Sequence, residues 1–161
     1  RGKIKEAIKI IMGKTEGDLH TFIADFKKEF NELEPEAIAF PRSCNNLKKY
    51  RDHNSIFIKG TPIHVKGALI YNHQVKEFGL QNKFPFIQEG DKIKFIKLVE
   101  ANPFKFDVIS YITSLPKEFK LQPYVDYETQ FEKTFLDPMR FVLQAIGWEH
   151  EPKASLEAFF E

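Results

Sequence analysis

Side chains that bind phosphate oxygens gather in one short stretch, residues 43–50. The stretch combines hydroxyl, amide, ammonium and phenol groups just before a polar loop. Such groups bind phosphate by hydrogen bonds and by charge. The candidate contacts in it are Asn45, Asn46, Lys49 and Tyr50. The stretch therefore indicates a site for a polyanion, with ordinary solvated surface as the alternative.

A second candidate anion site lies where a helix is expected to begin. Thr61 and Pro62 supply a capping hydroxyl followed by a proline at the first helical position. The N-terminus of a helix attracts anions, and His64 and Lys66 lie in its first turns. The alternative is a capped helix with an exposed lysine.

Residues suited to catalysis or metal binding are sparse. The five histidines, at positions 20, 53, 64, 73 and 150, lack metal-ligand spacing, and the single cysteine, Cys44, has no zinc partner. The sequence contains no phosphate-binding glycine loop and no nucleophile elbow. A Cys44 nucleophile paired with His53 or His64 is one alternative, and a small buried cysteine is the other. We therefore expect no catalytic residue, metal site or cofactor in this chain.

The C-terminal residues form an apolar box. Leu156, Phe159 and Phe160 fall on one face of a single helical turn. Chain ends are usually polar and mobile, so three large apolar side chains there are unusual. They predict an anchor for a pocket on this protein or on another.

The length of the chain suits one domain with a hydrophobic core, or one and a half small domains. It has 161 residues, with 24 basic and 23 acidic side chains and a formal net charge of +1. No apolar run approaches the roughly 20 residues of a membrane span, so no membrane association is expected. One cysteine fits a reducing compartment. The chain begins at Arg1 with a helical pattern and no leader, so we expect a piece of a longer polypeptide.

The pattern in the first half predicts mostly helices. One is expected over residues 4–13, and a second, with a capping box of Thr15 and Asp18, to about Leu33. The apolar stripe of the second helix comprises Leu19, Phe22, Ile23, Phe26, Phe30 and Leu33. The expected elements that follow are a strand over 36–40 closed by Pro41, a short helix or turn over 45–50 and a loop over 51–60.

The second half alternates between strands and helices. A helix should run from Thr61 to Phe78, with Val65, Ala68, Leu69 and Val75 buried. Strands are expected over 92–99 and 106–112, with a bulge or burial on both faces at Phe95 and Ile96. A helix over 126–136 is followed by a restart at Asp137 and Pro138. We therefore predict an α+β fold, mainly helical with a small antiparallel sheet, over residues 1–148, and a flexible tail over 149–161.

Six motifs, taken in order, carry a family resemblance. They are Asp25-Phe26-Lys27-Lys28-Glu29-Phe30; Asn45-Asn46 with Lys49-Tyr50; Pro62, His64, Lys66-Gly67, Leu69 and Tyr71-Asn72; Asn102-Pro103-Phe104; Glu132-Lys133-Thr134-Phe135 with Pro138; and Lys153-Ala154-Ser155-Leu156 with Phe159. In these residues the chain resembles the C-terminal thumb region of the family B DNA polymerases of T-even-like bacteriophages. The order and spacing of the motifs make the resemblance fairly specific.

The resemblance implies a thumb domain that grips primer–template duplex DNA on its minor-groove side, mostly through phosphates. The DNA contacts that it implies are Asn45, Asn46, Lys49, Tyr50, His64, Lys66 and Tyr71. Lys66 stands where relatives tend to have Arg, which keeps the charge but loses the planar fork. His73 also replaces a basic residue, so no contact is carried over there. The tail is implied to bind the sliding clamp through Leu156, Phe159 and Phe160, with a tail folded back on its own helices as the alternative.

The resemblance makes the chain part of a DNA-directed DNA polymerase, a nucleotidyltransferase, working in the cytoplasm of an infected bacterium. The palm carboxylates, which would hold Mg²⁺, are not in this sequence, so the chain alone should be inactive. Palm, fingers and exonuclease domains would belong to the same or a separate chain. Ile4, Ile8 and Ile11 are the expected docking surface for the palm. Two rivals remain: a protein-interaction or regulatory module without DNA binding, and a small enzyme that uses the histidines and Cys44.

Overall fold

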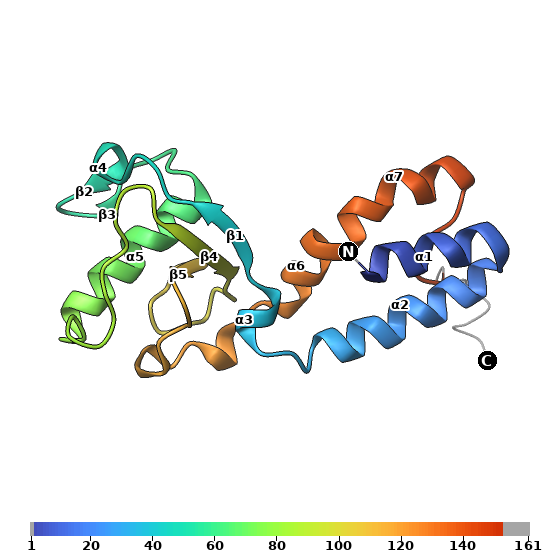
Figure 1. Ribbon diagram of the computed structural model, residues 1–161, viewed down its shortest axis with the longest axis horizontal. Coiled ribbons are helices and arrows are strands. Elements are labelled where there is room, and N and C mark those ends of the chain that lie inside the picture. Colours follow the sequence, from blue (N-terminus) through green and yellow to red (C-terminus); the bar gives the residue numbers. More distant parts are fainter. Residues whose placement is uncertain (1, 153–161) are drawn as a thin grey trace. The chain divides into compact units, whose positions relative to one another are not determined.

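The computed structural model describes residues 2–152, and these form two compact units (Figure 1). Unit 1 combines the residues up to Leu33 with those from Phe131 onward, and unit 2 comprises Glu34–Gln130. The elements confirm the α+β prediction, because helices predominate and a small antiparallel sheet is present. The predicted boundary between a domain over 1–148 and a tail over 149–161 stays a prediction.

Unit 1 is built on aromatic packing between helices. Helices α1 (Gly2–Gly13) and α2 (Glu16–Phe30) contact each other, and the predicted capping box is present. The Thr15 hydroxyl accepts a hydrogen bond from the Asp18 N–H at 3.2 Å, and the Asp18 carboxylate accepts one from the Thr15 N–H at 3.1 Å. The ring of Phe26 meets the edges of Phe131 and Phe135 at 5.4 and 5.0 Å between centroids. The predicted stripe therefore faces an aromatic core from Leu19 to Phe30, whereas Leu33 lies beyond the end of α2 and is 39% exposed.

The predicted helix from Asp137 and Pro138 onward is present, but its predicted separation from the preceding helix is wrong. Helix α6 (Tyr127–Phe131) continues through a π-helical turn (Glu132–Leu136) into α7 (Asp137–Ile146). A proline inside a helix lacks an N–H and its ring clashes with the carbonyl four residues earlier. The wider π turn before Pro138 accommodates both defects without ending the helix. The carboxylate of Asp137 instead pairs with Arg140 at 3.2 Å and Lys133 at 3.5 Å.

The sheet of unit 2 has three antiparallel strands in the order β1-β4-β5. They are β1 (Phe40–Ser43), β4 (Lys92–Lys97) and β5 (Val108–Tyr111). Phe95 pairs with Phe40 on one side and Ser110 on the other. Phe95 and Ile96 point to opposite faces and are both buried, so burial on both faces, not a bulge, explains their pattern.

The predicted strand over 36–40 is wrong. Pro35–Ile38 forms the short helix α3, and the strand begins only at Phe40 and passes through Pro41. Pro35 occupies the first helical position, where its missing N–H costs nothing. Pro41 is tolerated because β1 lies at the edge of the sheet.

Helix α5 (Ile63–Glu77) packs against β5 at a close approach. A Cβ on Gly67 would lie 2.8 Å from the backbone nitrogen of Ser110, so only glycine fits there. The Ser110 hydroxyl donates to the His64 carbonyl at 2.9 Å. The predicted helix end near Phe78 is confirmed, but the predicted Thr61 cap is wrong. The Thr61 hydroxyl donates to the Ile58 carbonyl at 2.6 Å, and Pro62 occupies the N-cap position.

The segment before α5 is more ordered than the predicted loop over 51–60. Helix α4 (Leu47–Tyr50) leads into a small hairpin of β2 (Arg51–Asp52) and β3 (Ile56–Phe57). The Asp52 carboxylate accepts hydrogen bonds from the N–H groups of Asn54 and Ser55 at 3.1 and 2.8 Å. This Asx turn reverses the chain, which composition alone did not distinguish from a loop.

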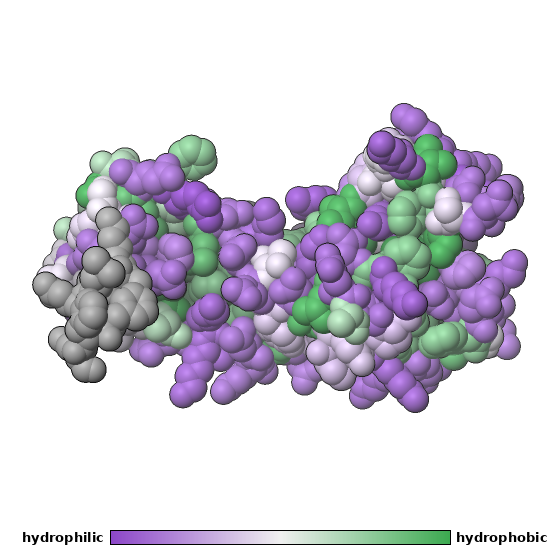
Figure 2. Space-filling view, turned by 180° about the vertical axis from the view of Figure 1, so that it is seen from behind, coloured by the Kyte–Doolittle hydropathy of each residue, from purple (hydrophilic) through white to green (hydrophobic). Residues whose placement is uncertain are grey.

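Hydrophilic residues cover much of the face in the space-filling view, with apolar residues between them (Figure 2). Among the described residues of unit 1, 2–33 and 131–152, the most exposed large apolar side chains are Met12 and Phe141, at 82% and 83% exposure. Ile8, in the expected docking surface, is 38% exposed, whereas Ile4 and Ile11 are half-buried. No helix within residues 2–152 has the length and apolarity that a membrane crossing requires.

Candidate nucleic-acid interface

Helix α4 carries the first group of predicted DNA contacts. Asn46 has a left-handed backbone (φ 68°), and the N–H groups of Asn46 and Leu47 donate to the Glu89 carboxylate at 2.7 and 3.0 Å. This carboxylate occupies the start of the helix, so the backbone there does not face an outside anion. Lys49 is exposed with its ammonium 5.2 Å from the centre of the Tyr50 ring, and Asn45 is also exposed.

His64 lies against the sheet. Its ring centroid is 6.3 Å from that of Phe95, and the Arg42 guanidinium lies 5.8 Å from the same Phe95 ring. Burial lowers the pKa of His64, and the positive charge of Arg42 lowers it further. The neutral imidazole can therefore donate or accept one hydrogen bond, but it adds little positive charge near pH 7.

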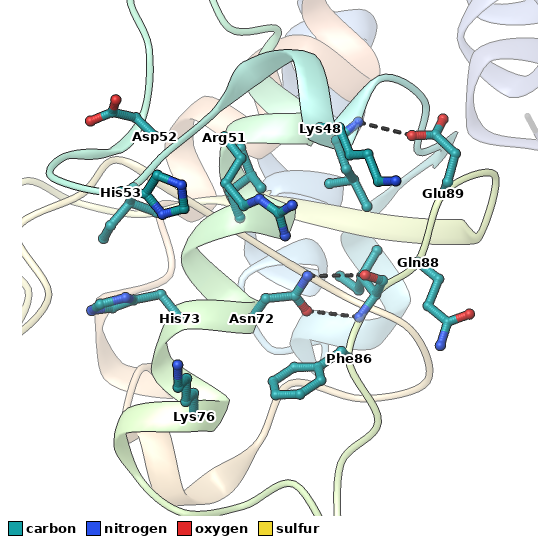
Figure 3. Close-up of a pocket in the computed structure, with 14 residues that line it drawn as sticks. Lys48, Arg51, Asp52, His53, Asn72, His73, Lys76, Phe86, Gln88 and Glu89 are labelled. Atoms are coloured by element: carbon teal, nitrogen blue, oxygen red, sulfur yellow. Dashed lines mark hydrogen bonds between the residues drawn. The ribbon is translucent and has the colours of Figure 1, made fainter.

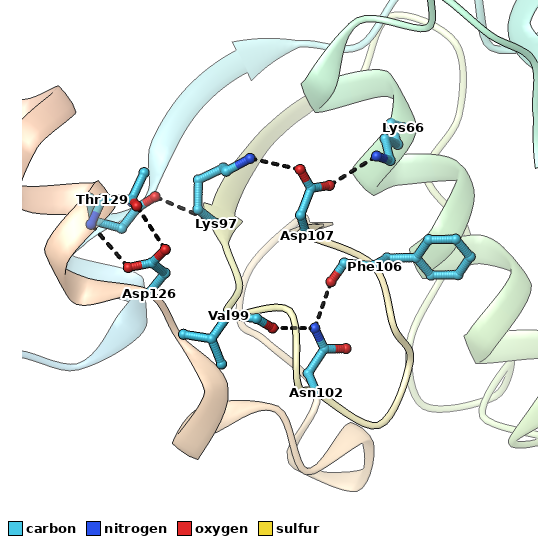
Figure 4. Close-up of polar contacts among 9 residues, drawn as sticks. Lys66, Lys97, Val99, Asn102, Phe106, Asp107, Asp126 and Thr129 are labelled. Atoms are coloured by element: carbon cyan, nitrogen blue, oxygen red, sulfur yellow. Dashed lines mark hydrogen bonds and ion pairs between the residues drawn. The ribbon is translucent and has the colours of Figure 1, made fainter.

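Lys66 belongs to an ion triad with Lys97 and Asp107 (Figure 4). Both ammonium groups lie 2.9 Å from the Asp107 carboxylate, one on each oxygen. Burial alone would raise the pKa of Asp107, but hydrogen bonds and charge from the two lysines outweigh it and bring the pKa to about 2. The Lys66 ammonium also lies 5.1 Å from the centre of the Phe57 ring. Half of the triad's cationic charge is thus neutralised inside the protein.

Tyr71 is part of the core. Its side chain is 2% exposed, and its hydroxyl donates to the Pro85 carbonyl at 3.0 Å. Burial raises the pKa of Tyr71 to about 12. Because the side chain does not reach the surface, we exclude it from the proposed interface.

The predicted residues share unit 2 but do not form one cluster. Asn46 caps α4 and Lys49 lies on it, whereas His64 and Lys66 leave α5 on different sides. Two residues along a helix differ by about 200° in direction, which explains why His64 meets Phe95 while Lys66 meets Asp107. The structure therefore brings the α4 pair together and separates the α5 pair.

A different set of cations lines a pocket between α4, the β2–β3 hairpin, α5 and residues 86–89 (Figure 3). The pocket has a volume of about 880 Å³. We call it the basic pocket, after its cationic and imidazole side chains, which are Lys48, Arg51, His53, His73 and Lys76. Its apolar lining includes Leu47, Leu69 and Ile87, with Phe86 beside them.

The two acidic residues of the basic pocket are occupied by hydrogen bonds. Glu89 accepts from the backbone of α4 as described, and Asp52 accepts from the backbone and hydroxyl of Ser55, at 2.8 Å in each case. The Ser55 hydrogen bonds lower the pKa of Asp52. Within residues 2–152, none of the five basic side chains of the pocket forms a salt bridge.

Sequence reasoning missed this pocket although its signals were present. Leu69, Asn72, His73 and Lys76 recur at helical spacing and form the wall that α5 contributes. Lys48 and Arg51 lie close together in the sequence, but nothing local shows that they face α5. The Asn72 side chain completes the wall by bonding both backbone groups of Ile87, at 2.7 and 2.9 Å.

The cysteine alternative loses its chemical basis in the structure. Cys44 is buried, and burial, with the negative charges of Glu89 and Asp91, raises its pKa to about 11. A thiol with such a pKa is protonated near pH 7 and is a poor nucleophile. Among residues 2–152, no three His, Cys, Asp or Glu side chains group closely enough to hold a metal ion.

Comparison with known proteins points to one class of protein. The chain is 30% identical over 161 residues to the DNA-directed DNA polymerase of Enterobacteria phage T4, a match covering 98% of this chain and 17% of that protein. It is 33% identical over 163 residues to the DNA-directed DNA polymerase of Escherichia phage RB69, covering 98% of this chain and 18% of that protein. This chain resembles phage DNA polymerases along nearly its whole length.

This similarity confirms the predicted resemblance to polymerases of T4-like phages. The chain spans less than a fifth of the length of the curated relatives that it matches. No protein-family model matches it. The thumb assignment and the individual DNA contacts stay predictions, and the box of Leu156, Phe159 and Phe160 lies outside the described residues.

Proposed function

We propose that this chain is the thumb region of a family B phage-type DNA polymerase and binds primer–template duplex DNA through its phosphates. The similarity to two phage DNA polymerases over 98% of the chain carries the proposal. The remaining polymerase domains supply the palm, its Mg²⁺ and the nucleotidyl transfer, so this chain by itself does not polymerise DNA. Its place of action is the cytoplasm of the infected host.

The exposed polar groups of unit 2 support binding that does not depend on base sequence. Asn45, Asn46 and Lys49 are exposed on or beside α4, and Tyr50 is half-buried there. Lysine and amide groups of this kind bind phosphates and fix register without reading bases. Lys49 has an unneutralised charge in the described part of the chain, whereas Lys66 shares Asp107 with Lys97. We therefore assign the larger share of phosphate binding to Lys49.

Binding of a duplex at several salt concentrations tests this function. Each neutralised phosphate adds about −0.9 to the slope of log affinity against log salt concentration. We expect Lys49→Ala with Lys66→Ala to reduce the slope by about 1 to 2. The matched control is Lys27→Ala with Lys28→Ala, which removes the same charge from exposed positions on α2. An equal slope for wild type and the first variant removes these lysines from the interface.

The C-terminal box supports a second contact, with the sliding clamp. Leu156, Phe159 and Phe160 have the spacing of a small apolar anchor, and a few such residues carry most of the energy of an interface. Tethering to a ring that encircles DNA would raise processivity. Titration of the cognate clamp with the full chain and with a chain ending at Lys153 tests it. Equal affinity of the two would end this part of the proposal.

A protein-interaction or regulatory module without DNA binding is the second candidate. The exposed Met12 and Phe141 of unit 1 favour a contact with another protein or domain. Under the first proposal, that partner is the rest of the polymerase. If the chain does not bind duplex DNA at low salt but still binds the other polymerase domains, the protein-interaction module is favoured.

A further inference from the structure

The cations of the basic pocket lack the internal partners that the structure gives to other lysines. Lys66 and Lys97 share Asp107, and Lys83 pairs with Glu118 at 2.7 Å. By contrast, Lys48, Arg51 and Lys76 form no salt bridge within residues 2–152 although they line one cavity. Both acids of the pocket already accept hydrogen bonds from the protein. Hydrogen bonds leave the carboxylates of Asp52 and Glu89 charged, but the three cations outnumber them, which favours an anionic ligand.

The lining of the same pocket suits a flat apolar group. Leu47, Leu69 and Ile87 are 8%, 4% and 2% exposed, so they form a closed apolar floor. Phe86 stands at its edge with 39% exposure (Figure 3). The Asn72 amide donates one hydrogen bond to Ile87 and accepts one from it, so it holds residues 86–89 against α5. Recognition there rests on shape, stacking and charge.

We propose that the basic pocket binds an unpaired nucleotide of single-stranded DNA, with its base on Phe86 and the apolar floor and its phosphates on Lys48, Arg51 and Lys76. This rests on the proposed DNA-binding function and adds a single-strand site to it. An aromatic platform beside a cationic groove is how proteins hold single strands without sequence preference. In a duplex, the faces of the bases are stacked on each other and cannot reach Phe86. The volume of about 880 Å³ matches a small-molecule site rather than a double helix.

An acidic peptide with an apolar anchor is the competing ligand. The planar groups of the pocket favour the nucleotide, since the Arg51 guanidinium, the imidazoles of His53 and His73 and the Phe86 ring all stack on bases. A peptide carboxylate would use the charges but leave these planar surfaces without a matching partner.

Fluorescence anisotropy of the full 161-residue chain with a labelled octathymidylate at low salt tests the proposal. We expect Arg51→Ala with Lys76→Ala to weaken binding at least about tenfold and to reduce the salt slope by about 1.4, for two phosphates of a single strand. The matched control, Lys5→Ala with Lys9→Ala, removes two exposed lysines from α1 and should stay within about twofold of wild type.

Phe86→Ala separates stacking from charge. We expect it to weaken octathymidylate binding by about fivefold to a hundredfold and to leave binding of a blunt duplex within about twofold. Because Phe86 is partly exposed, the variant should fold, which a thermal melt checks. Equal losses for octathymidylate and duplex overturn the claim that the base is unpaired.

Three further outcomes are decisive. Unchanged octathymidylate affinity in both pocket variants, with wild-type duplex binding intact, overturns the single-strand site and leaves the proposed function standing. If the wild-type chain binds octathymidylate through the pocket but does not bind duplex DNA, the single-strand site is supported and the proposed duplex binding is contradicted. The last outcome comes from competition with an acidic, Phe-containing peptide of the same charge. If this peptide displaces labelled octathymidylate at the same concentration as unlabelled octathymidylate does, the nucleotide assignment is overturned.

Discussion

Two cationic regions of unit 2 differ in whether their charge is already used. In the ion triad, Asp107 holds Lys66 and Lys97 at 2.9 Å each. In the basic pocket, by contrast, no salt bridge within residues 2–152 involves Lys48, Arg51 or Lys76, although Asp52 and Glu89 line the same cavity. A lysine held by a carboxylate stabilises the protein at the expense of free charge, whereas an unpaired cluster keeps its charge for a ligand. The pairing of a lysine therefore says more about its function than its exposure does.

Gly67→Ala should have the largest effect, because helix α5 contributes to both regions. The added Cβ would lie 2.8 Å from the Ser110 nitrogen and 3.1 Å from the Ile109 carbonyl carbon, so helix and sheet must separate. We expect the free energy of unfolding to fall by about 3 kcal/mol, measured by urea denaturation. Gly17→Ala on α2 is the control, since its Cβ meets only Thr15 at 3.8 Å, and it should be neutral or stabilising. Equal stability of the two variants would contradict the close packing of α5 on β5.

Asn72→Ala should break the basic pocket and spare the ion triad. It leaves the N–H and carbonyl of the buried Ile87 without their partners, for a loss of about 2 kcal/mol. Residues 86–89 would then lose their hold on α5. We expect weaker octathymidylate binding with little change in the salt slope for duplex. Both ligands weakening together would mean that the two regions are not independent.

Asp107→Asn should make the ion triad resemble the basic pocket. It removes the carboxylate shared by Lys66 and Lys97, so both ammonium groups become available to phosphates. We expect tighter duplex binding and a salt slope steeper by up to about 1 to 2. The Asp107 side chain is 42% exposed, so the stability loss should be only about 1 kcal/mol or less. Asp25→Asn, an exposed residue on α2, makes the same charge change and tests for a general charge effect.

The ion triad should also respond to acid. The pKa of Asp107 is lowered to about 2, so its contribution to stability is present above pH 4 and is lost as the pH falls toward 2. Wild type should therefore lose more stability than Asp107→Asn between pH 4 and pH 2, as thermal melts would measure. Parallel pH profiles would contradict the triad.

The smallest effect is expected at His64. Its pKa is lowered by burial and by Arg42, so the unfolded chain takes up a proton more readily than the folded chain. Stability should therefore decline as the pH falls below the ordinary histidine range near 6.5. His64→Gln should flatten this decline between pH 7 and pH 5, whereas His53→Gln, an exposed imidazole, serves as the control. An unaltered decline in His64→Gln would assign the pH dependence to another group.

The sequence predicted most elements whose signals are local. The stripe of α2, its capping box at Thr15 and Asp18, the end of α5 near Phe78 and the two strands of the second half are all confirmed. Two predictions that involved prolines were wrong. Pro35 starts a helix where a strand was expected, and Pro138 lies within a continuous helix. Pro35 is tolerated at the first helical position of α3, and Pro138 follows a π turn, so the local surroundings of each proline decided its effect.

By itself the sequence determined the α+β class, the order of the elements and the likeness to phage polymerases, because periodicity and motif order lie along the chain. Only the tertiary structure decided which cations are available. It placed Asp107 between Lys66 and Lys97, buried Tyr71, and gathered Lys48, Arg51 and Lys76 around one cavity. Electrostatic pairing depends on distance in space, and residues 41 positions apart, such as Lys66 and Asp107, become neighbours only when the chain folds.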